Sequence, residues 1–129
     1  MEEKLKEYAA LLVRVGLNVQ PGQTLVISAP VECAWFARLC AAEGYDAGCR
    51  EVVMNWSDDA LGRMKYLRAA DDVFDSVPLW RRHFYNDYAQ EGAAYLAISA
   101  SDPENLKGVD PGRVTRAQQA SGKALREFD

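Results

Sequence analysis

The sequence predicts an α/β fold in which an open, mainly parallel sheet is flanked by helices in a three-layer, Rossmann-like arrangement. Three observations support this class. Residues 23–28, 50–55 and 93–99 each contain a short apolar run, which is typical of strands covered on both faces. Longer helical patterns separate these runs, and Gly or Pro punctuates the boundaries. Strands that alternate with helices favour parallel pairing through right-handed crossovers.

The chain opens with a predicted amphipathic helix over residues 3–15. Its first residues include Glu2 and Glu3, whose negative charge suits the positive end of a helix dipole. Gly16 is expected to end it, because glycine adopts the left-handed conformation that often follows a helix. The apolar residues that recur at helical spacing are Leu5, Tyr8, Leu12 and Val15.

A turn, a strand and a second helix follow. Pro21-Gly22 predicts a type II turn, because proline suits its first central position and glycine accepts positive φ at the second. The segment QTLVIS then predicts the first strand. Pro30 is expected in the first turn of the next helix, where it costs no hydrogen bond, and that helix should continue to about Glu43.

The segment CREVVMNW predicts the second strand, at about residues 50–55. Ser57 is expected to cap a third helix. Asp58 and Asp59 would lie in its first turn, where the helix dipole favours acidic side chains.

A short turn of helix is expected next, with a break at Val77-Pro78 and a helix from Leu79 to about Gln90. Gly92 should close that helix, and AAYLAIS predicts the third strand. Asp-Pro occurs at residues 102–103 and 110–111 and places a capping side chain before a helical proline. A short helix and a final helix over residues 111–127 are therefore expected.

Size and charge limit the classes of protein. The 129 residues, 49% of them hydrophobic, predict a single α/β domain over residues 1–129. The net charge of −4 argues against nucleic acid as a partner. No apolar run approaches the roughly 20 residues that a membrane span needs, and the acidic N-terminus does not resemble a signal peptide. The sequence therefore favours a cytoplasmic protein that does not bind membranes.

The three cysteines predict reduced, buried thiols. Cys33, Cys40 and Cys49 are odd in number and contain no close C-x-x-C pair of the kind that zinc sites and redox motifs use. Cys33 and Cys40 are seven residues apart, on one predicted helix face with Phe36 and Leu39.

Ligands of parallel sheets usually lie beyond the carboxyl ends of the strands. Those positions here are Ser28-Ala29-Pro30, Asn55-Trp56-Ser57 and Ser99 to Asp102. Neither G-x-G-x-x-G nor G-x-x-x-x-G-K-[ST] occurs in the chain, so no phosphate-binding loop is predicted.

The titratable residues suggest no complete active site. Asp58 and Asp59 are adjacent on a predicted helix, so their side chains point about 100° apart and suit one cation poorly. His83 is the only histidine and has no H-x-x-x-H or H-x-E partner, which favours a surface position. Ser28, Ser57 and Ser99 lack a G-x-S-x-G elbow. We therefore assign no catalytic, cofactor-binding or metal-binding residue.

The segment LWRRHFYNDY allows two interpretations. Interleaved basic and aromatic residues occur in proteins that bind single-stranded nucleic acid. However, Trp80, Phe84 and Tyr88 follow one another at intervals of four residues and would form one stripe packed on the sheet. The favoured prediction is core packing, with Arg81 and Arg82 on a charged surface.

Three segments, in the same order along the chain, resemble the M29 family of metallo-aminopeptidases. LVRVGLNVQPGQTLVISAPVE carries the family's G-x-N-x-Q-x-G-x-x-L-x-I turn and strand. EVVMNWSDD resembles its second strand and acidic helix start, and EGAAYLAISASDPENLKGVDPGR resembles its third strand and D-P-x-x-L-x-G-V-D-P loop. The likeness covers nearly the whole chain.

The resemblance implies that this chain is the N-terminal scaffold, or cleft-wall domain, of a longer aminopeptidase that removes N-terminal residues from peptides. Members of the family bind two divalent metal ions, of the zinc, cobalt or manganese type, through Glu, His and Asp side chains in a later portion. No residue here matches those ligands, so none is carried over and the chain alone is expected to be inactive. The implied partners are the C-terminal catalytic domain, peptide substrates and a second copy in a homo-oligomer.

The alternative is a stand-alone α/β interaction module without catalysis, which would bind a protein partner through a sheet edge or an exposed helix. The coding sequence after Asp129 separates the two interpretations. If the chain is a piece of a longer protein, apolar surface normally covered by the rest would be exposed, and the isolated chain is expected to self-associate.

Overall fold

The computed structural model describes residues 2–99 and 107–124. The chain divides into two compact units, one containing residues 1–58 and 92–100 and the other residues 59–91 and 101–129. We call the first the sheet unit and the second the helical unit, and describe each by itself. Among the described residues, no helix is both long and apolar enough to span a membrane.

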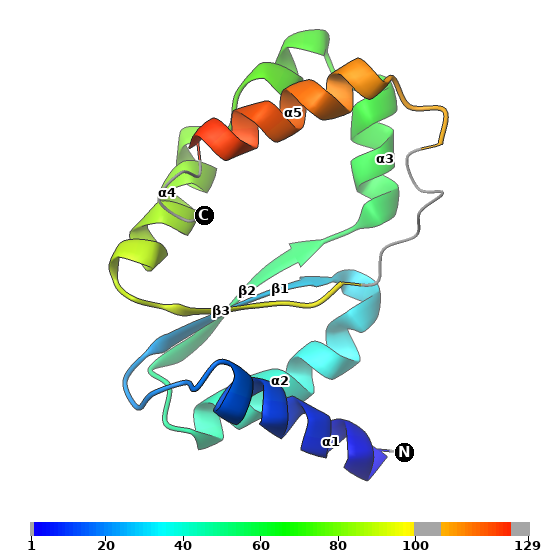
Figure 1. Ribbon diagram of the computed structural model, residues 1–129. Helices are drawn as coiled ribbons and strands as arrows, with labels where there is room; N and C mark the ends of the chain where they lie inside the picture. Colours follow the sequence, from blue (N-terminus) through cyan, green and yellow to red (C-terminus); the bar gives the residue numbers. More distant parts are fainter. Residues whose placement is uncertain (1, 100–106, 125–129) are drawn as a thin grey trace. The chain divides into compact units, whose positions relative to one another are not determined.

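The sheet unit contains three parallel strands in the order β2-β1-β3 (Figure 1). These are β1, Thr24–Pro30; β2, Glu51–Ser57; and β3, Ala94–Ala97. The parallel α/β architecture predicted from the apolar runs is therefore confirmed. Because β1 is the central strand, its consecutive residues Leu25, Val26 and Ile27 are each at most 1% exposed, as expected of a strand without a solvent face.

Two helical segments cover one face of this sheet (Figure 1). The first begins as α1, Glu2–Ala10, and continues as a π-helix, η1, Leu11–Gly16, so the helix predicted over residues 3–15 is present. The second is a 3-10 turn, η2, Val31–Cys33, followed by α2, Ala34–Asp46. Together they bury a core against β1 whose members include Ala9, Val13, Leu25, Ile27, Phe36, Ala37 and Cys40.

The predicted Pro21-Gly22 turn joins the entrances of all three strands. Gly22 has a φ of 80°, and its N–H donates to the carbonyl oxygen of Gly48 just before β2. Gln23 accepts a hydrogen bond from Arg50 N–H at its carbonyl oxygen, and its side-chain amide donates to the carbonyl oxygen of Gly92 at 2.9 Å. The turn therefore aligns the amino ends of β1, β2 and β3.

The helical unit contains α3, Asp59–Arg68; a 3-10 helix, η3, Asp71–Asp75; α4, Leu79–Gln90; and α5, Pro111–Ala124. The helix predicted from Leu79 to Gln90 is confirmed, as is the break at Val77-Pro78. The Asp110 carboxylate accepts a hydrogen bond from Gly112 N–H at 2.9 Å, which confirms the second Asp-Pro cap. The first, at residues 102–103, lies outside the described residues.

Three boundary predictions were wrong. Pro30 ends β1 rather than beginning a helix, with φ −69° and ψ 150°. The fixed φ of proline suits an extended conformation as well as a helical one, and a strand end tolerates the missing N–H. Ser57 pairs with Pro30 as the last residue of β2 and therefore does not cap α3. The second helix also runs beyond Glu43, to Asp46.

Candidate functional site

The carboxyl ends of β1 and β2 bring two predicted site segments together. Ser28 pairs with Asn55, and Pro30 pairs with Ser57 in the parallel register. The Asn55 side-chain amide donates to the Ser28 hydroxyl oxygen at 3.2 Å. These two segments therefore meet at the carboxyl end of the sheet, where ligands of parallel sheets usually bind.

The third predicted segment begins beside them. Ser28 also pairs with Ala97 of β3, and the Ile98 N–H donates to the Ser28 carbonyl oxygen at 2.8 Å. Ser99 follows directly, whereas residues 100–102 lie outside the described part of the chain. The carboxyl end of the sheet thus offers hydroxyl and amide groups that can hydrogen-bond a ligand. These groups do not take up protons at neutral pH.

The described residues do not fit the pair of metal ions that the family resemblance implies. Within residues 2–99 and 107–124, no group of three or more His, Cys, Asp or Glu side chains could hold a metal ion. Asp59 lies in the first turn of α3, as predicted, and Asp58 immediately precedes that helix. We therefore derive no catalytic step through a metal from these residues.

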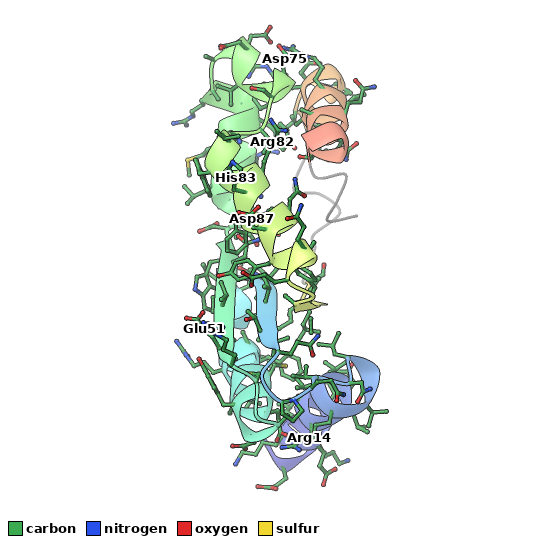
Figure 2. All side chains as sticks on the ribbon, turned by 90° about the vertical axis from the view of Figure 1, so that its left-hand side faces the viewer. Arg14, Glu51, Asp75, Arg82, His83 and Asp87 are labelled. Atoms are coloured by element: carbon green, nitrogen blue, oxygen red, sulfur yellow. The ribbon has the colours of Figure 1, made fainter. Side chains whose placement is uncertain are left out.

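His83 lies on the surface of α4, as predicted. Its side chain is 62% exposed, and its Nδ1 atom is 3.6 Å from an Asp87 carboxylate oxygen, one helical turn away (Figure 2). Arg81 and Arg82 are also exposed. The Arg81 guanidinium lies over the Tyr85 ring, 5.7 Å from its centroid.

The prediction that Trp80 packs in a core was wrong, because its side chain is 70% exposed. The buried aromatic residue of α4 is Tyr85, which is 7% exposed. Five helical residues separate the two by about 140° around the axis, so a face that buries Tyr85 excludes Trp80. Phe84 and Tyr88 remain partly buried and meet edge to face, with centroids 5.4 Å apart.

The cysteines are free thiols, as predicted, and the two that are buried are poor nucleophiles. Burial, together with the nearby Glu43 carboxylate, raises the pKa of Cys40 to about 11. Burial also raises the pKa of Cys49. Cys33 is only half-buried and belongs to η2, so the predictions that it is buried and that it shares a helix face with Cys40 were wrong. At neutral pH Cys40 and Cys49 are therefore protonated.

One polar cluster of the helical unit was missed by sequence reasoning. Arg116 of α5 binds the Asp75 carboxylate through two hydrogen bonds of 2.8 Å. It also donates to the Asp71 carboxylate at 3.0 Å and to the Asp71 carbonyl oxygen at 2.8 Å. These hydrogen bonds lower the pKa of Asp75 and raise that of Arg116.

A second arginine one turn earlier completes this attachment of α5. The Arg113 guanidinium lies 4.9 Å from the ring centroid of Phe74, which is 2% exposed, and donates to the Tyr66 carbonyl oxygen at 2.9 Å. The Tyr66 and Phe74 rings are stacked with centroids 5.5 Å apart. The sequence signal was the spacing of Arg113 and Arg116, three residues apart on one face of α5. The cluster is structural, because each of its charges is matched within the unit.

The fold places this chain among α/β domains with a parallel sheet. The carboxyl ends of its strands present hydrogen-bonding groups, and the described residues contain no complete set of catalytic side chains. All 129 residues match the thermophilic metalloprotease family M29, and the chain belongs to that family. The family resemblance read from the three sequence segments is therefore confirmed.

Relatives of this family align with most of the chain. Aminopeptidase 2 of Geobacillus stearothermophilus is 39% identical over 127 residues, which are 98% of this chain and 31% of that protein. Aminopeptidase T of Thermus aquaticus is 38% identical over 124 residues, 96% of this chain and 30% of that protein. The structure of wild-type AmpT from Thermus thermophilus matches with a TM-score of 0.89 and 35% identity, over 98% of this chain and 32% of that one. The chain thus spans about a third of their length.

Proposed function

We propose that this chain is the N-terminal scaffold and cleft-wall domain of a longer two-metal aminopeptidase. One observation carries the proposal: all 129 residues match the family, and the chain aligns with only 30–31% of the length of relatives that are named aminopeptidases. In this proposal the peptide substrate, the metal ions and the partner catalytic domain belong to the longer protein.

The chemistry of the described residues favours a structural role over a catalytic one. In an aminopeptidase of this kind, two bound divalent ions supply an activated water and polarise the scissile carbonyl. The donor set for such ions is not found among residues 2–99 and 107–124. What this chain contributes is the carboxyl end of its sheet, where Ser28 and Asn55 can hydrogen-bond a peptide that approaches the cleft.

The first experiment compares this chain with the product of its complete reading frame. The intact mass of the protein expressed from the full gene shows whether the frame continues past Asp129. Both products are then assayed with leucyl peptides in the presence of Zn²⁺, Co²⁺ or Mn²⁺, with a chelator as the control. We expect metal-dependent cleavage from a longer product only. Cleavage by the purified 129-residue chain itself would overturn the scaffold assignment.

A second experiment tests the cleft wall in the longer protein. Asn55→Ala removes the side-chain donor at the carboxyl end of β2, and Gln119→Ala, at an exposed position of α5, is the control. We expect Asn55→Ala to lower kcat/KM for longer peptides more than for dipeptides, with unchanged metal content. Equal effects on both substrates would argue against a wall that contacts the peptide.

The stand-alone interaction module remains the second candidate, and the exposed apolar side chains favour it. Val15 and Trp80 are 71% and 70% exposed, one in each unit. Such residues suit contact with another protein. A stop codon directly after Asp129, with no peptidase activity, would support this candidate and reject the first. The cytoplasmic location expected from the sequence stays a prediction under both.

A further inference from the structure

The helix α3 packs into the helical unit through the side that carries Tyr66. The Tyr66 ring is stacked on Phe74, which is 2% exposed, with centroids 5.5 Å apart. The Tyr66 carbonyl oxygen also accepts a hydrogen bond from Arg113 of α5. None of the ten described residues of α3 is itself buried. The helix is therefore attached along one side and leaves its other side at the surface.

That other side of α3 carries a row of exposed apolar side chains. Leu61 is 60% exposed, Leu67 47% and Met64 44%. Successive members are three residues apart, so the row lies within about 120° around the helix axis. Met64 comes two residues before Tyr66, which places these two side chains about 160° apart. We call Leu61, Met64 and Leu67 the α3 face.

The helical unit has few apolar side chains that could cover such a surface. Its buried apolar side chains are Phe74, Tyr85 and Val109, and the sheet unit contains the other buried ones among the described residues. Leu79 and Trp80 of the same unit are also 62% and 70% exposed. Exposed apolar side chains that gather on one side of an element mark interaction surfaces. We therefore expect another piece of protein to cover the α3 face.

Basic side chains border the α3 face along one flank. Lys65 and Arg68 lie in the last turn of the helix, each directly after a member of the row. Both are exposed, and neither forms an ion pair among the described residues. The one acidic residue of α3, Asp59, lies in its first turn. A two-fold contact with a second copy would gather basic side chains from both chains, which opposes association. The complementary surface is apolar and bordered by carboxylates.

The length of the relatives indicates what supplies that surface. The chain aligns with 30–31% of the length of proteins that are named aminopeptidases, so about two thirds of such a protein lie outside it. The last described helix, α5, belongs to the helical unit, as do residues 101–129 (Figure 1). A chain that continues as the relatives do therefore leaves from the unit that carries the α3 face.

We propose that the α3 face is the surface on which the rest of the longer protein packs, through an apolar patch whose bordering carboxylates pair with Lys65 and Arg68. The inference rests on the proposed function, because it needs a chain that continues beyond Asp129. It specifies which surface of this chain holds the catalytic part in place. In this proposal α3 joins the two parts and does not contact the peptide.

The first test measures whether the α3 face is covered in the product of the complete reading frame. Leu67→Cys and, as the control, Gln119→Cys at an exposed position of α5 are made in that product and in the 129-residue chain. Maleimide labelling is read by mass spectrometry of peptides, which separates the new thiols from the native cysteines. In the longer product we expect labelling to slow at least about tenfold for Leu67→Cys and less than about twofold for Gln119→Cys.

The outcomes separate this inference from the proposed function. Equal labelling of Leu67→Cys in the two products, or equal slowing at both positions, would overturn the inference alone if the longer product still cleaves peptides with metal. A frame that stops directly after Asp129 would overturn both. If labelling of Leu67→Cys in the 129-residue chain slows as its concentration rises, the α3 face binds a second copy and the proposal is wrong.

The second test reverses the charges that border the α3 face. Lys65→Glu and Arg68→Glu, added together to Leu67→Cys in the longer product, should speed labelling at least about fivefold, because the new carboxylates repel those of the covering surface. The matched control adds Arg81→Glu and Arg82→Glu, which change the charge equally at exposed positions of α4. Circular dichroism checks that each variant is folded. Equal effects of the two pairs, or no effect of the first, would reject the paired carboxylates.

Discussion

Gly44 of α2 packs directly against the sheet, and its replacement by alanine should destabilise the protein. A Cβ atom built at this position would lie 2.8 Å from a methyl carbon of Leu25, 3.5 Å from Val52 and 3.6 Å from the sulfur of Cys49. Leu25 is fully buried in the central strand, so its side chain has little room to move away.

The magnitude follows from two opposing effects. Alanine is favoured over glycine within a helix by about 1 kcal/mol. Overpacking a close-packed core costs about 1–3 kcal/mol. Gly62, in α3, provides the comparison, because a Cβ atom there meets nothing within 4 Å. The helix preference is common to both sites, so the difference between Gly44→Ala and Gly62→Ala measures the packing cost of about 1–3 kcal/mol.

The assay is urea unfolding followed by circular dichroism, with amide hydrogen exchange read separately for α2 and α3. Gly62→Ala should raise the free energy of unfolding by up to about 1 kcal/mol, whereas Gly44→Ala should lower it. Adding Leu25→Val, which removes the obstructing methyl group, should make the Gly44→Ala change less costly by more than about 0.5 kcal/mol. Equal stabilisation by both glycine replacements would refute the reasoning.

Three further predictions concern the helical unit and the thiols. Phe74→Ala should lower the free energy of unfolding by about 3–5 kcal/mol in urea titrations, because Phe74 is 2% exposed; a loss below about 1 kcal/mol would contradict its central place. The hydrogen bonds from Arg116 lower the folded-state pKa of Asp75, so their contribution is present above the unfolded pKa of about 3.9 and is lost as the pH falls through the lower folded value. Thermal unfolding between pH 6 and pH 2.5 should show this loss, and Asp75→Asn should remove that part of the slope. With a pKa of about 11, about one Cys40 thiol in a thousand is ionised at pH 8, so maleimide should label Cys33 well before Cys40 in the folded protein. Equal labelling rates, determined by mass spectrometry of peptides, would count against burial of Cys40.

The site at the carboxyl ends of β1 and β2 could be predicted only in part from the sequence. Apolar runs and the rule for parallel sheets located the segments that contain Ser28 and Asn55, and the register brings the two side chains together. The hydrogen bond between them depends on strand order, because β1 must lie beside β2, and no local pattern encodes that order. The assignment of Ser57 to a helix cap was wrong because the ladder with β1 extends β2 by two more pairs, through Trp56 and Ser57, and ladder pairing outweighs a local capping preference.

By itself, the sequence determined the features that depend on neighbouring residues. The Pro21-Gly22 turn, the break before Leu79 and the Asp110-Pro111 helix start follow from backbone geometry and local hydrogen bonds. The buried run Leu25 to Ile27 follows from its continuous apolar character.

The tertiary structure alone decided the features that join distant residues. Arg116 binds Asp75, 41 residues earlier in the chain, and Gly44 leaves room for Leu25 across a helix–strand contact. Trp80 is exposed although its spacing suggested a core position, because the helix face that is buried was set by Tyr85. Each outcome depends on which surfaces meet after folding, and periodicity along one segment specifies an apolar side without specifying the partner that covers it.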